Sequence, residues 1–492
     1  MPITRRSLLI GAGATGLAGV VGGCASAADS ADASATASGS LDSNASALPT
    51  PSGSAPVSTI GADVLVPLQL FANQALNQET LFAFGAAAVQ TSEVGEMLRI
   101  VQTINQATGN PAELNTGVFD AYYDGFGAFG DQLAAAAEAT SSPVSKRQRL
   151  QRASMYATLQ TFFVLGTSAP DRELDIAQVC QNRFDQAVAL YDPPPTKFSV
   201  TTSYGDLPGY FFRPADNNDS RPTLILSNGS DGQNIEMVAF GVFAGLQRGY
   251  NVAIFEGPGQ MLTLFDRQIP FTPDWDEVVG AVFDWVKDQK GVGKVGLVGI
   301  SFGGMLCARA AAKVPGLSAV VLEPAAYNAA ALWGDQEAVQ SVRQALALPV
   351  DQQQAAREKL NAEYLQIIPS LPKETQFNIA KRGEIYNIQT MLDARAGKPT
   401  SDYFGMLEAM LQFDFQADYA QITIPTMLTA NEGDIFFDQQ SAQAVDFLTK
   451  VPAGDKVLQR FTAAQGTQLH DQPNGPTAGQ EAIFDWLDTH LR

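Results

Sequence analysis

The chain has 492 residues, of which 45% are hydrophobic and 17% charged, and its formal net charge is -20. This length allows two to four domains, and the composition is that of a folded acidic protein. No stripe of lysine and arginine is present to neutralise phosphates, so we expect no nucleic-acid partner.

Residues 1–24 have the pattern of an export signal. Arg5 and Arg6 precede an apolar, glycine-rich run over residues 8–21, which is too short to span a bilayer comfortably. The adjacent arginines resemble a twin-arginine signal. We therefore expect an exported protein.

Cys24 ends the tetrapeptide Val-Gly-Gly-Cys, which resembles a bacterial lipobox. Processing there would make Cys24 a lipidated N-terminus, and the protein would contact a membrane only through that anchor. An ordinary secretory signal cleaved near residues 25–27 is the alternative. We expect a cell-surface lipoprotein in the first case and a secreted or periplasmic protein in the second.

Two segments of different character follow the signal. Residues 25–58 are rich in Ala, Ser, Asp and Pro, and such a segment cannot bury enough surface to offset the entropy of ordering it. We expect a disordered tether there. Residues 59–192 carry apolar residues at three- and four-residue spacing, which predicts an α-helical cap domain that ends at the prolines 193–195.

After the prolines the sequence alternates between short apolar runs and helical patterns. The runs FSVTT and GYFFRP predict paired strands, and TLILS, NVAIF, KVGLVGI and LSAVVLE follow with the helical segments IEMVAFGVFAGLQR, DEVVGAVFDWVKDQ and FGGMLCARAAAK between them. Such alternation predicts a mostly parallel sheet with helices on both faces. We assign residues 196–325 and 420–492 to this α/β core. Residues 326–419 form a helical insertion after the sixth strand, which we expect to act as a lid.

Cysteine and histidine are rare. Cys180 and Cys307 are the remaining cysteines, and their apolar, helical contexts predict buried free thiols. With two histidines in the chain and no clustered cysteines, we expect no metal site and no cofactor.

Ser301 lies in Gly-Ile-Ser-Phe-Gly, between an apolar run that predicts a strand and an alanine-rich run that predicts a helix. This context is that of a nucleophile turn, in which Gly299 and Gly303 permit close approach of the backbone. A helix-capping serine at a tight turn is the alternative. We identify Ser301 as the candidate nucleophile.

A serine nucleophile needs a general base, and His470 and His490 are the two histidines available. His490 is two residues from the C-terminus, where a surface histidine is expected. His470 lies in a polar loop between the last predicted strand and the last predicted helix, which is where the base of an α/β-hydrolase falls. We expect His470 to be the base.

The acid should follow a strand between the nucleophile and the base. Asp434 stands at the turn after the seventh strand, and the chain order Ser, Asp, His fits the hydrolase fold. Asp438 is the fallback, Glu432 a poorer one, and Glu323 at the end of the sixth strand a different topological option. Asp471 adjoins His470, and we expect it to face solvent.

An oxyanion hole would be formed by backbone N–H groups. The small residues of NGSDG after the third strand allow the backbone to approach a substrate carbonyl. The expected donors are the N–H of Phe302 and that of Gly229 or Ser230. A loop with two glycines and no such role is the alternative.

Several short segments together resemble one known group. NGSDG, FEGPGQ, GISFGG, EGD and QLHDQ, behind a helical N-terminal region, resemble the α/β-hydrolases that include 2,6-dihydroxypseudooxynicotine hydrolase, the fungal heptaketide-shortening pigment hydrolases and the fermentation-respiration-switch esterase-like proteins. The resemblance covers roughly residues 60–492. It implies the α/β-hydrolase fold, a Ser/Asp/His triad and a site covered by the N-terminal helices. Two departures stand out: the insertion after the sixth strand is long, and Met261 replaces the second glycine often found in the group's Pro-Gly-Gln-Gly turn.

Three functions are compatible with these residues. The first, which we favour, is a serine hydrolase that cleaves an ester or amide carbonyl of a small molecule through an acyl-enzyme. The second, implied by the resemblance, is hydrolysis of a carbon–carbon bond in a β-diketone, polyketide-like or aryl ketone substrate. The third is a non-catalytic lipoprotein that binds small molecules on a hydrolase scaffold.

Overall fold

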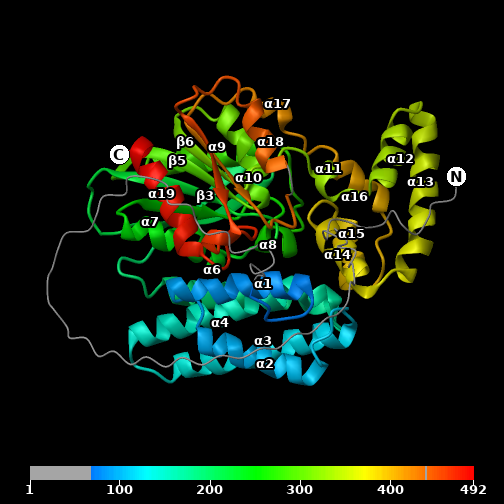
Figure 1. Ribbon diagram of the computed structural model, residues 1–492, viewed down its shortest axis with the longest axis horizontal. Helices are drawn as coiled ribbons and strands as arrows, with labels where there is room; N and C mark the ends of the chain where they lie inside the picture. Colours follow the sequence, from blue (N-terminus) through cyan, green and yellow to red (C-terminus); the bar gives the residue numbers. More distant parts are fainter. Residues whose placement is uncertain (1–67, 438–439) are drawn as a thin grey trace, which may run out of the picture. The chain divides into compact units, whose positions relative to one another are not determined.

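The computed structural model describes residues 68–437 and 440–492 (Figure 1). The predicted export signal with Cys24, the predicted tether at 25–58 and the fallback residue Asp438 lie outside the described residues. None of the helices formed by the described part of the chain is long and apolar enough to cross a membrane.

Five helices form the N-terminal region, and Figure 1 shows α1 to α4 side by side beneath the sheet. Asn73, Asn115 and Ser142 cap three of them by accepting a hydrogen bond from a backbone N–H of the first turn, which satisfies a donor that the helix itself leaves free. The helices are α1 (Gln74–Gly85), α2 (Val94–Thr108), α3 (Thr116–Glu138), α4 (Pro143–Phe163) and α5 (Glu173–Val188).

An eight-stranded sheet follows, in the order β1-β2-β4-β3-β5-β6-β7-β8. β1 and β2 form an antiparallel hairpin, β2 pairs antiparallel with β4, and all other neighbours are parallel. The strands are β1 (Thr196–Thr202), β2 (Gly205–Phe212), β3 (Arg221–Ser227), β4 (Asn251–Phe255), β5 (Val292–Ile300), β6 (Leu317–Glu323), β7 (Thr426–Asn431) and β8 (Lys456–Phe461).

Successive residues of the central strands enter two different cores. Ile225 and Leu297 belong to one buried cluster, whereas their neighbours Leu224, Leu226 and Val298 belong to another. This follows from the two-residue period of a strand, so both faces of the sheet must be covered. The first face carries α9 (Trp275–Lys287) and α10 (Phe302–Lys313), and the second carries α7 (Phe243–Gln247), α19 (Pro476–Leu491) and side chains of α1–α5.

The helix predicted for IEMVAFGVFAGLQR is interrupted in the structure. A short helix α6 (Asn234–Met237) leads into a wider turn, Val238–Val242, before α7 begins. Gly241 lies in that turn, against β3, and a Cβ there would come within 2.9 Å of the Leu226 side chain. Close approach to the sheet therefore explains the break, which the helical spacing of the sequence does not reveal. Two further helices, α8 (Met261–Phe265) and α18 (Gln440–Phe447), follow β4 and β7.

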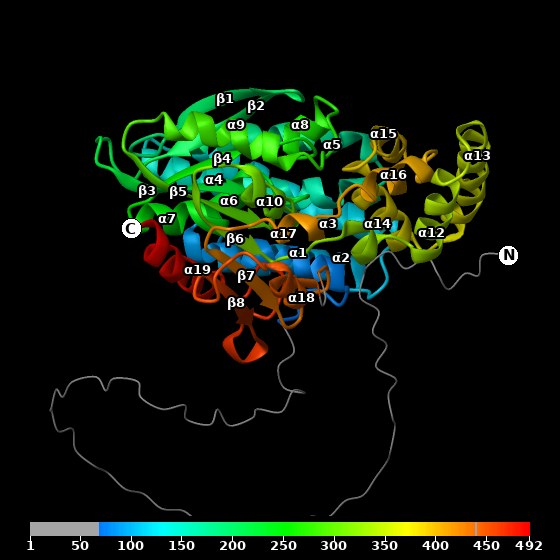
Figure 2. The same cartoon turned by 90° about the horizontal axis from the view of Figure 1, so that it is seen from above.

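The chain between β6 and β7 is helical, as the sequence predicts. Its helices α12 and α13 lie at the end away from the sheet in both Figure 1 and Figure 2. The helices are α11 (Ala329–Trp333), α12 (Gln336–Leu346), α13 (Val350–Ile367), α14 (Lys373–Glu384), α15 (Ile388–Arg395), α16 (Tyr403–Met410) and α17 (Gln416–Tyr419).

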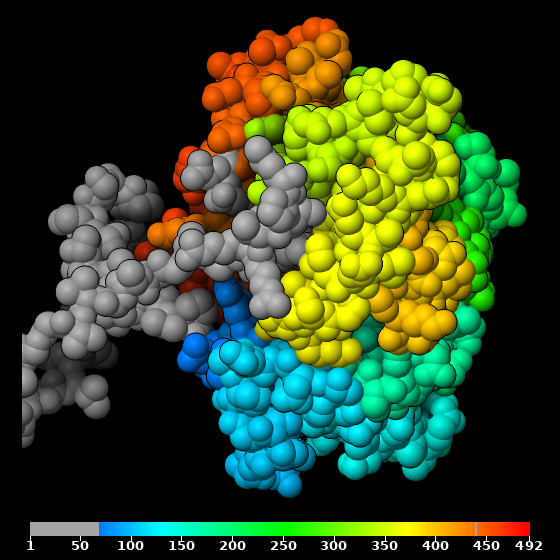
Figure 3. Space-filling view, turned by 90° about the vertical axis from the view of Figure 1, so that its right-hand side faces the viewer, coloured from blue at the N-terminus to red at the C-terminus, as the bar shows by residue number. Residues whose placement is uncertain are grey.

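The insertion packs against the N-terminal helices, and Figure 3 shows the two in contact over one face of the molecule. Phe377 of α14 stacks on Phe163 with ring centroids 5.5 Å apart. Arg395 of α15 donates to the Glu173 carboxylate at 2.7 Å, and the Glu173 side chain is fully buried. A buried carboxylate is costly unless it is paired, so this ion pair favours one fixed arrangement of the two segments.

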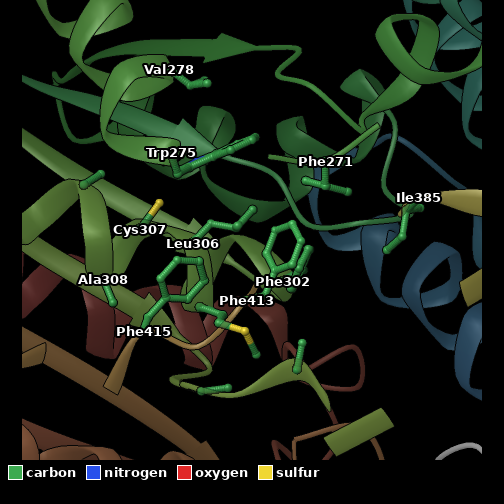
Figure 4. Packing of buried hydrophobic residues seen from close by; sticks show 14 of the residues in the cluster. Phe271, Trp275, Val278, Phe302, Leu306, Cys307, Ala308, Ile385, Phe413 and Phe415 are labelled. Carbon is green, nitrogen blue, oxygen red and sulfur yellow. The ribbon is translucent and has the colours of Figure 1, made fainter. Parts of the chain in front are cut away.

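Phe302, the first residue of α10, sits among aromatic side chains from several elements (Figure 4). Its ring lies 4.9 Å from that of Phe271 and 5.5 Å from that of Phe413, which comes from the insertion. The backbone N–H of Phe271 also donates to the carbonyl of Ile385 in the insertion, at 2.8 Å. The start of α10 is thereby held in place by both the core and the insertion.

Candidate active site

Ser301 occupies a tight turn between β5 and α10. Its backbone has φ 54° and ψ -124°, which is an unfavourable conformation for a residue with a side chain. A Cβ at Gly299 would lie 2.2 Å from the carbonyl oxygen of Gly303, and one at Gly303 would lie 2.5 Å from that of Ser227. Both positions therefore require glycine, and the turn projects Ser301 from the end of the sheet.

His470 reaches Ser301 from the loop between β8 and α19. Its Nε2 lies 2.9 Å from the Ser301 Oγ, and its Nδ1 lies 2.9 Å from Oδ2 of Asp434. The imidazole ring stacks on Phe437 with centroids 4.9 Å apart and contacts Phe436 edge to face. These aromatic contacts bury the ring and fix its orientation, so one hydrogen-bonded series joins the three side chains.

Asp434 is itself held in place by the loop that follows β7. Its Oδ1 accepts hydrogen bonds from the backbone N–H groups of Phe436 at 2.8 Å and Phe437 at 3.1 Å. Its Oδ2 is left to face His470. Hydrogen bonds of this kind fix the orientation of a carboxylate.

The other carboxylates considered from the sequence lie elsewhere. Glu432 is exposed and accepts from the backbone N–H of Ala463 at 2.8 Å. Glu323 is buried at the end of β6, where burial raises the pKa of its carboxyl to about 8, and it makes no hydrogen bond to His470. The structure thus brings Asp434 to His470, and neither Glu432 nor Glu323.

Opposing effects act on the charge of His470. Burial lowers the pKa of the imidazole, but the negative charges of Asp434 and Asp471 outweigh it and raise the pKa to about 9. The imidazolium form is therefore well supported at this position. His490, in the last turn of α19, has its pKa lowered by partial burial.

Of the three predicted oxyanion donors, one is already hydrogen-bonded in the structure and two are not. The N–H of Gly229 donates to the side chain of its neighbour Asn228 at 2.8 Å, so it is already engaged. The N–H groups of Ser230 and Phe302 donate to no other group within residues 68–437 and 440–492. These two remain the free backbone donors beside Ser301.

Gln260 fixes the loop that carries these donors. Its Nε2 donates to the carbonyls of Asn228 at 2.6 Å and Gly229 at 3.0 Å, and its Oε1 accepts from the N–H of Gly257. The next residue, Met261, has φ 44°, a conformation that favours glycine. The turn therefore keeps its geometry although Met261 stands where related turns have glycine.

A pocket opens above Ser301. Its wall comes from the N-terminal helices, the insertion and the loops at the strand ends, and it is largely aromatic. The apolar lining consists of Phe82, Leu159, Phe162, Phe240, Ile300, Trp333, Phe436 and Phe437, and the polar lining includes Glu79, Asp231, Glu236, Arg382, His470 and Asp471. An aromatic pocket with a few polar groups is typical of a site for a small organic molecule.

Two charged residues of this pocket form an ion pair across elements. Arg382 of α14 donates to the carboxylate of Asp231, which follows the oxyanion loop. Burial alone would raise the pKa of Asp231, but Arg382 and Lys381 outweigh it and hold the pKa below its ordinary value. The insertion thereby anchors the loop next to Ser301.

Glu79 of α1 lines the same pocket without a fixed partner. Its carboxylate makes no hydrogen bond and no ion pair to any of the residues that the structure describes. Burial, reinforced by Asp231 and partly offset by Arg382, raises the pKa of Glu79 to about 8. Sequence reasoning missed Glu79 and Arg382, because each occupies an ordinary position of an amphipathic helix and carries no motif.

The expectation for Asp471 is wrong. The residue does not face solvent, because its side chain is 5% exposed and lines the pocket beside His470. Cys180 and Cys307 are buried free thiols, as predicted.

Comparison with known proteins agrees with the fold. Residues 240–459, a little less than half of the chain, match the model of the alpha/beta hydrolase fold family. The chain therefore has the fold of the alpha/beta hydrolases. This confirms the predicted fold class.

Two curated relatives of this chain are fungal proteins. The hydrolase LUC6 of Fusarium sp is 30% identical over 263 residues, which cover 51% of this chain and 61% of that protein. The 20-hydroxy-prefusarin hydrolase FUS2 of Gibberella moniliformis is 29% identical over 259 residues, which cover 49% of this chain and 59% of that protein. The alignments thus span about three fifths of the length of these relatives.

Among solved structures, this chain is similar in fold to 2,6-dihydroxy-pseudo-oxynicotine hydrolase. The TM-score is 0.55 at 18% sequence identity, and the match covers 83% of this chain and 95% of that one. The match therefore extends well beyond the sheet. A sequence identity of 18% supports a similarity of fold alone.

Replacing Gly229 with Ala tests the packing beside the nucleophile. A Cβ at this position would lie 2.6 Å from the Ser301 Cβ and 3.1 Å from its Oγ, so Ser301 must move. A displacement of about 1 Å costs about 100-fold in rate, and we expect a loss of at least this size in labelling of Ser301 by a fluorophosphonate. Gly454→Ala is the control, because nothing lies within 4 Å of its added Cβ. Equal labelling of both variants would contradict this account.

Proposed function

We propose that this chain is a serine hydrolase that cleaves an ester or amide carbonyl through an acyl-enzyme. The observation that carries the proposal is the hydrogen-bonded series from Ser301 Oγ through His470 to Asp434, with both distances at 2.9 Å. The nucleophile turn with positive φ supports the same assignment.

In the first step, the Ser301 Oγ attacks the carbonyl carbon while its proton passes to Nε2 of His470. Asp434 stabilises the imidazolium through its bond to Nδ1. The N–H groups of Ser230 and Phe302 receive the negative charge that develops on the carbonyl oxygen. The imidazolium then protonates the leaving alcohol or amine, and the acyl group stays on Ser301.

In the second step, water replaces the leaving group beside His470. The imidazole takes a proton from the water, the hydroxide attacks the acyl carbon, and the carboxylic acid is released as Ser301 recovers its proton. Both steps use the same base and the same oxyanion donors. No cofactor takes part in this scheme.

The pocket favours a substrate with an extended apolar or aromatic part. Phe82, Phe162 and Trp333 come from elements outside the sheet and form its upper wall. Burial of a flat apolar group against such rings stabilises binding by roughly 25 cal/mol for each Å² removed from water. The polar groups of the pocket are few, so each has a strong effect on which substrates fit.

Replacing Ser301 with Ala tests the proposal most directly. We expect hydrolysis of short acyl and aryl esters to fall by about 1,000-fold or more, because the attacking oxygen is lost. The two histidines provide a matched pair: His470→Ala should lose activity to a similar degree, while His490→Ala, on the surface helix α19, should retain it. Ester hydrolysis that survives in Ser301→Ala with its rate unchanged would end the assignment.

A second candidate reaction is hydrolysis of a carbon–carbon bond next to a ketone, and Glu79 favours it. This cleavage expels an enolate carbon, which must gain a proton to leave as a ketone. Glu79 lines the pocket with Ser301, and its pKa of about 8 keeps its carboxyl protonated at neutral pH. One curated relative is the 20-hydroxy-prefusarin hydrolase of Gibberella moniliformis.

Replacing Glu79 with Gln separates the two reactions. The amide keeps the size of the side chain but has no acidic proton, so cleavage of a β-diketone to a ketone and a carboxylic acid should fall at least about 100-fold, the scale of a lost general acid. Ester hydrolysis should change far less, since His470 protonates that leaving group. In the wild type, the ratio of β-diketone cleavage to ester hydrolysis should also decline above pH 8, where Glu79 loses its proton. An equal fall of both activities would reject an acid role for Glu79.

We also propose that the protein is exported and anchored by a lipid on Cys24, on the strength of the lipobox-like sequence and the paired arginines. Cys24→Ser should move the protein from the membrane fraction to the soluble fraction and remove the lipid mass from its N-terminal peptide. Cys180→Ser is the control, because that thiol is buried in the folded region. Membrane association that persists in Cys24→Ser would contradict the anchor.

A further inference from the structure

Asp471 contacts the reactive nitrogen of His470. Its Oδ2 lies 3.4 Å from Nε2, the same atom that faces the Ser301 Oγ at 2.9 Å. Asp434 holds the opposite nitrogen, so the imidazole has a carboxylate on each side. Oδ1 of Asp471 is buried and has no hydrogen-bond partner in the part of the chain that the structure describes.

An unusual backbone turn places this carboxylate. Asp471 has φ 54° and Gln472 has φ 51°, two consecutive residues in the left-handed region without a glycine. The turn is closed by a hydrogen bond from the N–H of Gln472 to the carbonyl of Leu469 at 2.9 Å. Such a conformation is unfavourable for a residue with a side chain, although Asp tolerates it better than most residues. The turn bends the side chain of Asp471 back against the ring that precedes it.

The titratable groups around this pair are mostly carboxyl groups, and burial raises the pKa of three of them to about 8. Four carboxyl groups interact electrostatically with His470 or Asp471: Glu79 of α1, Glu236 of α6, Glu323 of β6 and Asp434 of the loop after β7. A fifth, Asp231, is paired with Arg382. Among the residues that the structure describes, no lysine or arginine lies within 4 Å of the Asp471 carboxylate. His470 is therefore the cation that Asp471 meets.

We propose that Asp471 is a second carboxylate partner of His470, which stabilises the imidazolium from the Nε2 side and thereby sets the pH range in which His470 acts as a base. This inference rests on the proposed role of His470 as the base. Asp471 acts through His470 and is a positioning residue in this sense. It does not replace Asp434, which holds Nδ1 and fixes the tautomer.

The protonation states of Asp471 and His470 predict the direction in which activity changes with pH. Asp471 is one of the charges that raise the pKa of His470 to about 9, while burial raises the pKa of Asp471 itself to about 7, an effect that His470 partly offsets. On lowering the pH, His470 gains its proton first, with Asp471 still ionised. Since the base must be neutral, activity should rise with pH towards 9.

Removal of the Asp471 charge should therefore shift the pH profile in one direction. An opposite charge at this distance changes a pKa by about one unit or more, so His470 becomes neutral at lower pH in Asp471→Asn. The acid limb of the kcat/KM profile therefore moves to lower pH by the same number of pH units. A weaker base also gives a lower plateau at high pH, so the variant should be faster than the wild type in acid and slower in alkali. If Asp471 served folding alone, the variant would lose activity at every pH, and the pH profiles of variant and wild type would not cross.

The two histidines of the chain make a direct measurement practicable. In protein labelled with ¹⁵N-histidine, the imidazole signals belong to His470 and His490, and His490→Gln assigns them. The titration is run on Ser301→Ala, which has no nucleophile, so it reports the pKa of His470 without any turnover. We expect a value well above 6.5 in this background and a fall of about one unit or more on adding Asp471→Asn.

A second variant and a charge control complete the design. Asp471→Gly also removes the carboxylate, suits φ 54° and introduces no amide that could bond Nε2. Glu432→Gln removes one exposed negative charge from the end of β7 without contact to His470, and should leave the titration unchanged.

An unchanged pKa of His470 in both Asp471 variants, or a wild-type value at or below 6.5, overturns the proposal. If one variant fails to fold, which the His490 signal reports, the other variant and the wild-type value decide. Failure of the proposed function looks different: the titration shifts as expected, while no ester or ketone is cleaved.

Discussion

The close approach of three backbone segments at the end of β5 is the constraint on which the site depends. Gly303 leaves room for the carbonyl of Ser227, Gly304 for that of Pro324 and Gly229 for the side chain of Ser301. The ends of β3, β5 and β6 therefore meet with no side chain between them. Only then does the Ser301 turn place Oγ within reach of a histidine that comes from the far end of the chain.

Around this centre, the sheet and the helical regions have separate tasks. The loops and turns after β3, β5, β7 and β8 carry Ser230, Ser301, Asp434 and His470, in that order. The N-terminal helices and the insertion supply much of the wall of the pocket. Burial is what makes the carboxylates beside His470 effective, because charges interact more strongly away from solvent.

Much of the site could be predicted from the sequence, for identifiable reasons. Ser301 carries a motif with a strand before it and a helix after it, His470 is one of only two histidines, and Asp434 follows the correct strand. The family comparison confirms the fold that these residues imply. The insertion after β6 was also visible as a break in the strand–helix alternation.

The remaining features depend on information that no local pattern contains. The N–H of Gly229 is engaged because the Asn228 side chain folds back onto it. Asp471 is buried because two successive residues take positive φ, which nothing in the letters Leu-His-Asp-Gln indicates. Glu79 and Arg382 enter the pocket from helices about 300 positions apart, so only the tertiary structure brings them together.

Two of the contacts that join the insertion to the N-terminal helices lie apart from the reacting side chains. Neither the stacking of Phe377 on Phe163 nor the pairing of Arg395 with Glu173 involves a residue that lines the pocket. The helices that cover the pocket are thus held together in part at points that a substrate does not touch. A lining side chain such as Phe82 can therefore change without disturbing these two contacts, so the range of substrates can change in evolution while the reacting groups stay the same.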